Sequence, residues 1–482
     1  MRSALRFPAT LLAAIARLAA APASGLLAGA PLAGGRRAGP ASRLRRSLRA
    51  STAEGLFAEL VAACAGTTAL TGWALHLGAS PLEVGLVGAL PQLAQVVQLP
   101  AAWATALHGR RRVAIAAVTL SRQALLPLAF LPFLGLGPAP ARAVVLAVAS
   151  LSAALGVVGN NAWTAWMGEL VPEGLRGRYF GRRTAACTLG GTLAGVAAAR
   201  MLDAAGARQA VGPALAALAA LACAFGAVTT FLMSRQHEPP VPAAPRPTLA
   251  ASLRPWRDPE ARGLLLYQLA WNASVGLGGG YFTFFLLHDV GAGFTVVAMQ
   301  AAGSAAARVL TAPLWGKAVD RFGARPVLAA CSFAVAGLPV VWLATGPGRL
   351  WPIAVDAVVG GVAWGGHALA SFTVPLAVAP RRDRPFYLGA FAMAGGIAYA
   401  GAAAAGGALV AVLPRTVSTL LGAGTPLAVL FAISAAGRLA SATLALRIPE
   451  RGAGTLLELH RAARGAVAAV AIRMAGRRPE PG

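Results

Sequence analysis

The chain has 482 residues, of which 57% are hydrophobic and 12% charged, and its formal net charge is +26. A soluble domain of average composition has about 25% charged residues, so this composition excludes an ordinary soluble protein. The basic excess alone would suggest nucleic-acid binding. All but three of the 42 basic residues lie in segments between long apolar runs, however, and most of these segments are on one side, so we expect no nucleic-acid partner.

The N-terminal segment 1–53 contains nine arginines and no acidic residue. Its apolar run 9–21 is interrupted by Arg17 and ends without a convincing cleavage site. We therefore predict a retained cytoplasmic tail that is disordered or lies on the membrane surface. A cleaved signal peptide is the alternative.

Twelve apolar segments follow, most of them about 20 residues long, which is enough to cross a hydrocarbon core of about 30 Å. Only a helix satisfies its own backbone within such a segment, and strand-type alternation is absent. The predicted spans are 56–78, 84–106, 113–134, 143–167, 184–201, 213–233, 263–287, 294–314, 326–345, 351–378, 386–412 and 425–446. This pattern predicts an all-α polytopic membrane protein with twelve transmembrane helices.

A Pro-rich segment, 234–262, divides the spans into six and six and is predicted to be a cytoplasmic linker. We expect two pseudo-symmetric six-helix bundles, 54–233 and 263–447, followed by a C-terminal tail, 448–482. If both termini are cytoplasmic, 34 of the 42 basic residues lie on that side and five on the other. This asymmetry follows the positive-inside rule and predicts that both termini are cytoplasmic.

A signature of Pro-x3-Arg-x2-Tyr-x-Gly occurs twice, 208 positions apart, although the chain has only five tyrosines. Each copy lies between two predicted spans, at the same point in its half of the chain. The residues are Pro172, Arg176, Tyr179 and Gly181 in the first copy, and Pro380, Arg384, Tyr387 and Gly389 in the second. The repeat indicates a duplicated bundle, which is how many secondary transporters are built.

A second motif lies between the eighth and ninth spans and contains Gly316, Asp320, Arg321, Gly323 and Arg325. The glycines permit tight turns. The carboxylate of Asp320 can accept hydrogen bonds from Arg321, Arg325 or a helix N-terminus. A cluster of this kind can form in one conformation and open in another; a turn that only sets topology is the alternative.

This pattern resembles the cytoplasmic signature of the major facilitator superfamily. A degenerate copy, 109–112, lies 214 positions earlier, with Ala106 where the family has an aspartate. The tyrosine loops resemble those of poorly characterised bacterial permeases of the same superfamily. The resemblance covers residues 54–447 and implies the twelve-helix fold of that family in a bacterial inner membrane.

The resemblance also implies a secondary active transporter that moves a small molecule by alternating access. A non-transporting sensor or assembly protein on the same fold is the alternative. We expect no enzyme, because the chain has neither H-E-x-x-H nor G-x-S-x-G. We expect a monomer in contact with lipids, with no cofactor or metal, since the four cysteines lack ligand-like spacing.

Ionisable and polar residues inside the spans are candidates for the transport pathway, because they are costly in a membrane. By resemblance, the first, fourth, seventh and tenth helices line the cavity. That implication assigns Arg122 and Arg438, on peripheral helices, to structural or snorkelling roles. The substrate or ion-pathway candidates are Glu59, Asn160, Asn161, Trp163, Gln268, Asn272, Asp356 and His367.

A coupling proton is a candidate partner, carried by His367, Glu59 or Asp356. For His367 the alternative is a packing role. The polar stripe of Gln92, Gln95 and Gln98 could contact substrate or join helices. The cytoplasmic gating candidates are Glu169, Arg176, Arg178, Gly316, Asp320, Arg321, Gly323, Arg325 and Arg384.

Overall fold

The computed structural model describes residues 40–239, 248–380, 384–413, 426–450, 454–462 and 464. Within these ranges the chain is helical apart from turns and one isolated bridge, so the all-α prediction is confirmed. Most of the two predicted tails and residues 240–247 of the linker lie outside the described residues. The side chains of Arg176, Arg178 and Arg384 also lie outside them.

Helices occupy each of the first six predicted spans. Gly66, in an extended conformation, and Pro91, inside a helix, mark the breaks within the first two spans. The elements are α2 (Pro40–Ala65), α3 (Thr67–His76), α4 (Pro81–Leu93), η1 (Ala94–Val97), α5 (Gln98–His108), α6 (Arg110–Gln123), α7 (Leu126–Phe130), η2 (Leu131–Phe133), α8 (Pro138–Leu170), α9 (Glu173–Gly206) and α10 (Val211–Ser234).

Helices also occupy the six spans of the second half, which contains two π-helical turns, η3 and η4. The elements are α11 (Leu249–Arg257), α12 (Pro259–Gly279), α13 (Tyr281–Phe284), η3 (Phe285–Asp289), α14 (Phe294–Phe322), α15 (Ala324–Ala336), α16 (Leu338–Leu343), α17 (Trp351–Val355), η4 (Asp356–Gly360), α18 (Gly361–Val378), α19 (Arg384–Val412) and α21 (Leu427–Ala445).

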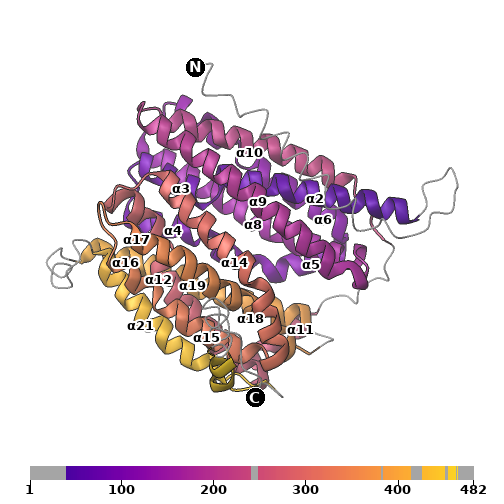
Figure 1. Ribbon diagram of the computed structural model, residues 1–482. Helices are drawn as coiled ribbons and strands as arrows, with labels where there is room; N and C mark the ends of the chain where they lie inside the picture. The colour runs from indigo at the N-terminus through magenta and orange to yellow at the C-terminus, as the bar shows by residue number, and fades with distance from the viewer. Residues whose placement is uncertain are drawn as a thin grey trace, which may run out of the picture.

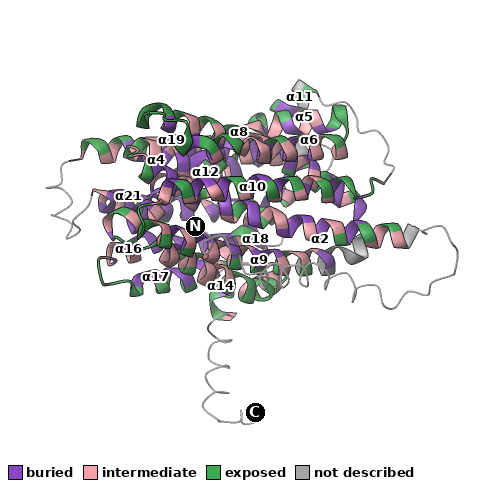
Figure 2. Ribbon diagram, turned by 90° about the horizontal axis from the view of Figure 1, so that it is seen from above, coloured by how far each residue is buried: buried purple, intermediate pink, exposed green. Residues whose placement is uncertain are grey.

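Ten helical stretches of the described chain are long and apolar enough to cross a membrane. The seventh and eighth predicted spans are helical but are not among the ten. Large apolar side chains lie on the outside of the bundle, including Leu310 (77% exposed), Val412 (76%) and Phe133 (73%). Buried residues lie along the inner helix faces (Figure 2). The protein is therefore an integral membrane protein.

The helices of the first half lie together on one side of the molecule and those of the second half on the other (Figure 1). The halves meet where α4 packs on α19 and α9 packs on α14. We call the end with the Gly109 and Gly323 turns the motif end, and the opposite end, where α9 finishes and α14 begins, the Asp203 end. The exact boundaries of the two bundles stay a prediction.

Candidate functional site

A cavity of about 290 Å³ lies inside the second half of the chain, and Asp356 is one of its walls. Asp356 is the first residue of the π-helical turn η4 and is 8% exposed. The side-chain amide of Gln300, from α14, donates a hydrogen bond to its Oδ2 at 2.7 Å. Single π-helical turns inside α-helices frequently occur at functional sites, because the extra residue redirects the side chains next to it.

Arg438, from α21, lines the same cavity and is 2% exposed. Its Nε has no hydrogen-bond partner, and its guanidinium carbon lies 6.0 Å from the centre of the Phe282 ring. Among the described side chains, no ion pair joins Arg438 to Asp356. Of the two expected roles, snorkelling is excluded for Arg438, because the side chain reaches from α21 into the interior instead of extending to the membrane surface. A structural role stays a prediction.

Four aromatic residues form part of the cavity wall, beside aliphatic side chains, glycines and a few polar groups. Phe282, Trp342, Trp364 and Tyr399 come from four different helical segments and surround the two charged residues, together with Ser304. A small apolar space with a few polar groups at fixed positions is the usual composition of a ligand-binding pocket.

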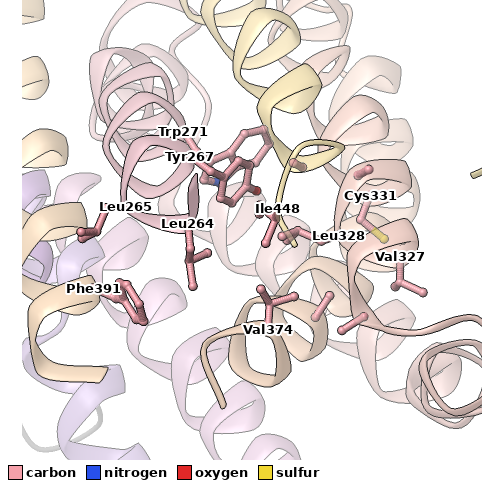
Figure 3. Packing of buried hydrophobic residues seen from close by; sticks show 14 of the residues in the cluster. Leu264, Leu265, Tyr267, Trp271, Val327, Leu328, Cys331, Val374, Phe391 and Ile448 are labelled. Atoms are coloured by element: carbon pink, nitrogen blue, oxygen red, sulfur yellow. The ribbon is translucent and has the colours of Figure 1, made fainter. Parts of the chain in front are cut away.

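His367 lies behind this wall, in the buried core of the second half. Its Nε2 is 2.9 Å from the hydroxyl of Tyr267, which is also 2.9 Å from the Ser332 hydroxyl. Its Nδ1 is 3.3 Å from the Ser371 hydroxyl, and its ring stacks on Trp271 at 4.8 Å. Figure 3 shows Tyr267 and Trp271 among the packed side chains of this core. Both ring nitrogens have partners, which favours the packing role.

A second cavity, of about 360 Å³, lies in the first half and is lined by Asn160, Gln95 and Gln98. Asn161 donates to Gln98 at 3.0 Å, and Gln98 donates to Gln95 at 2.9 Å. The polar stripe of the second span therefore contacts α8, through the hydrogen bond between Gln98 and Asn161. It also leaves Asn160 and Ser152 at the cavity surface.

Three other pathway candidates lie outside both cavities. The Asn272 amide donates to the backbone and side chain of Gln268, at 2.8 and 3.0 Å, and lies close to Gly395 of α19. Glu59 is exposed on α2 and lies against Gly191 of α9. These side chains are at helix contacts and are not brought together with Asp356.

The structure shows a buried charge cluster that the sequence prediction missed. Glu54 is 5% exposed and forms ion pairs with Arg183 at 3.2 Å and Arg122 at 3.7 Å. The Arg183 guanidinium also lies over the Trp163 ring at 4.5 Å. Glu54 precedes the predicted start of the first span by two residues, and for that reason it was not considered. Arg122 and Trp163 therefore hold α6 and α8 to α2 and α9, and Arg122 does not snorkel.

At the motif end, the carboxylate at the start of α15 belongs to Glu450 and not to Asp320. The backbone N–H groups of Ala324 and Arg325 donate to Glu450 at 3.0 and 2.7 Å. Gly323 has a φ of +86° and connects α14 to α15. Asp320 is exposed and has no hydrogen bond or ion pair with another described side chain. The expected pairing of Asp320 with Arg321 or Arg325 is therefore not formed.

The neighbouring motif residues make local contacts. The Arg321 guanidinium lies 5.1 Å from the centre of the Phe322 ring, and Arg325 donates to the Gly454 carbonyl at 3.4 Å. Gly316 lies within α14 and faces open space, so the turn expected at this glycine is not formed.

The first half contains a counterpart of this arrangement. Gly109 has a φ of +88°, and the backbone N–H of Arg111 donates to Glu238 at 3.4 Å. Glu238 follows α10 as Glu450 follows α21, 212 positions later. The gating candidate Glu169 pairs with Arg110 at 3.4 Å. The repeated acidic residue after the sixth and twelfth spans was a signal that the sequence prediction did not use.

The two tyrosines of the repeated signature have equivalent positions. Tyr179, in α9, is 2% exposed and donates to the Leu48 carbonyl of α2 at 3.2 Å; burial raises the pKa of its phenol, which keeps it a donor. Tyr387, in α19, is fully buried and donates to the carboxylate of Asp258, which caps α12. Each tyrosine thus anchors one helix to the first helix of its half.

At the Asp203 end, a single carboxylate joins the two halves. Asp203, in the last turn of α9, accepts hydrogen bonds from the backbone N–H groups of Phe294 and Thr295 at 2.7 and 2.8 Å. It also accepts one from the Thr295 hydroxyl at 2.5 Å. A carboxylate at a helix N-terminus satisfies unpaired N–H groups and interacts favourably with the helix dipole. This contact was not predicted.

Comparisons with known proteins identify the fold. A family model described as Major Facilitator Superfamily matches residues 55–288. No curated protein sequence matches the chain. The nucleoside transporter NupG is similar in structure, with a TM-score of 0.63, 14% identity, and coverage of 83% of this chain and 100% of that chain.

Two further solved structures are similar over most of their length. A D-xylose-proton symporter has a TM-score of 0.60 and 15% identity, covering 85% of this chain and 100% of its own. The fucose:proton symporter FucP of E. coli has a TM-score of 0.55 and 14% identity, and the match covers 84% of this chain and 100% of FucP. At these identities the similarity is one of fold.

Proposed function

We propose that this chain, which belongs to the major facilitator superfamily, is a secondary active transporter that moves a small polar molecule by alternating access. The observation that carries the proposal is the cavity between Asp356 and Arg438. Ionisable side chains inside a membrane bundle are costly unless they serve a substrate or ion pathway. Both residues are buried and face the same space.

In this proposal the two halves of the chain rock against each other, so that the site opens to one side at a time. The contact of Asp203 with the start of α14 supports a conformation in which the Asp203 end is closed. The contact joins the halves by hydrogen bonds alone, without a covalent link, so it can break when that end opens. The motif end then carries the opposite gate, with the side chains of Asp320 and the loop arginines as its candidates.

We further propose that the protein lies in a bacterial inner membrane with both termini cytoplasmic, because the basic loops gather at the motif end. Asp356 is the residue we assign to a coupling proton, since it is a carboxylate at the cavity surface. Glu59 is a second candidate. His367 is left out, because both of its ring nitrogens already have partners.

Counterflow into proteoliposomes tests the proposal. Purified protein is reconstituted, vesicles are loaded with unlabelled solute, and entry of the labelled solute is measured for panels of sugars, nucleosides and amino acids. We expect the protein to exchange solutes of one of these panels. This exchange should be lost in the Asp356→Asn variant and absent from protein-free vesicles. If no panel exchanges and the accessibility of the Asp203 end never changes, the protein is not a transporter of this kind.

A further inference from the structure

The guanidinium of Arg438 forms no ion pair with a described side chain, although the Asp356 carboxylate on the wall of the same cavity lies within electrostatic reach of it. A guanidinium has five N–H donors and no acceptor. At 2% exposure, Arg438 has no hydrogen-bond partner for Nε, and its guanidinium carbon lies 6.0 Å from the centre of the Phe282 ring. A buried charge without compensation is strongly destabilising. The cavity surface beside Arg438 is therefore a place where a carboxylate would bind well.

Asp356 has the opposite charge, and its carboxylate can accept further hydrogen bonds from a positively charged group. A carboxylate has about four acceptor positions; Gln300 donates to Oδ2, and the Trp342 side chain is a second donor beside the carboxylate. Asp356 and Arg438 both line the cavity but do not form a direct ion pair there. The cavity thus has a negative group and a positive group at separate points on its wall, each with unused hydrogen-bonding capacity.

Charge balance and size restrict the ligand. The two side chains sum to zero net charge, so a ligand with a net charge would leave one of them opposed to a like charge or unpaired. The volume of about 290 Å³ is at the lower limit for ligand pockets and equals that of roughly ten water molecules. We propose that this cavity binds a small zwitterion, with its carboxylate on Arg438 and its ammonium group on Asp356.

The aromatic wall supports the same class of ligand. Trp342, Trp364 and Tyr399 line the cavity together with Asp356. The faces of such rings attract an ammonium group, including a methylated one, and they also pack against a short aliphatic side chain. A neutral sugar could accept hydrogen bonds from Arg438, but it would not neutralise its charge. Amino acids and betaines of a few carbon atoms fit all of these conditions.

The inference rests on the proposed transport function, and its first test uses the unmodified protein. Labelled amino acids and betaine are offered to proteoliposomes in the counterflow assay. The best amino acid is then challenged with its own methyl ester, which has a net charge of +1, and its N-acetyl derivative, which has a net charge of −1. Since each derivative leaves one buried charge unpaired, we expect each to compete about 30-fold more weakly or worse than the parent.

Variants locate the binding site. Arg438→Gln and Asp356→Asn should each reduce zwitterion exchange by about 30-fold or more. Arg438→Lys, which keeps the charge, should restore part of it. The matched control is Arg349→Gln, which removes an exposed arginine outside the predicted spans and should leave exchange unchanged. Thermal unfolding of each purified variant identifies any variant that does not fold. If a variant does not fold, the competition by the charged derivatives on the unmodified protein decides the result.

The outcomes separate this inference from the proposed function. Exchange of sugars or nucleosides without exchange of zwitterions would overturn the inference and support transport. The inference would also be overturned if the charged derivatives competed as well as the parent zwitterion. It would be overturned too if the Arg438→Gln and Asp356→Asn variants folded and still exchanged the zwitterion. Absence of exchange for every panel, with no change in accessibility at the Asp203 end, would refute both.

Discussion

Replacing Asp203 should open the Asp203 end of the molecule. Asp203→Ala removes a carboxylate that accepts two backbone N–H bonds and one hydroxyl bond at the start of α14. Loss of a helix N-cap costs about 0.5–2 kcal/mol, and loss of a negative charge at the positive end of the helix dipole costs about 0.3–1 kcal/mol. Together these two losses destabilise the closed state by about 2 kcal/mol. If the contact exists only in the closed state, the closed-to-open ratio falls about 30-fold.

Thiol labelling measures this change. The four native cysteines are buried and free, and they are first replaced. A reporter, Ala74→Cys, is then placed in a buried cluster where α3 and α4 of the first half meet α13 and η3 of the second. We expect a membrane-impermeant maleimide to label this cysteine slowly in the Asp203 background and about 30-fold faster in Asp203→Ala, if labelling follows the open population.

Two further variants calibrate the result. Thr295→Val removes only the hydroxyl bond to Asp203, and a loss of about 1 kcal/mol should speed labelling about fivefold. Asp289→Asn removes a different carboxylate near the same end and should have no effect. Labelling rates that are equal in Asp203→Ala and in the parent would refute the view that this contact holds the end closed.

Four smaller predictions concern helix anchoring and can be checked by thermal unfolding in detergent. Tyr179→Phe and Tyr387→Phe each remove one buried hydrogen bond and should each lower stability by about 1 kcal/mol, with additive effects, because the sites are in different halves. Glu450→Gln weakens the cap of α15 and should cost about 1 kcal/mol. Gly323→Ala forces a side chain into a positive-φ conformation and should cost about 1–3 kcal/mol. Glu54→Gln leaves two partly buried arginines without their carboxylate and should cost about 3 kcal/mol. A stability equal to the parent in any of these variants would contradict the contact assigned to that residue.

Much of the fold could be predicted from sequence because its signals are local. A transmembrane helix is set by one continuous apolar segment, and each of the twelve predicted ranges is helical in the structure. The repeated tyrosines also mark positions that the structure makes equivalent, since Tyr179 and Tyr387 each anchor the fifth helix of their half to the first. Of the two motif glycines expected at turns, Gly323 is at one, whereas Gly316 lies inside α14.

The site depended on contacts between distant segments, which a single sequence does not specify. Asp356 was identified as a buried acid, but its neighbour Arg438 was assigned to the periphery, because helix order alone does not tell which face of α21 points inward. Likewise, Asp320 was expected at the helix terminus that Glu450 occupies 130 positions later. The sequence by itself determined the helices, the duplication and the membrane environment. Only the tertiary structure decided which charges meet, because ion pairs and cavities form between side chains that packing brings together.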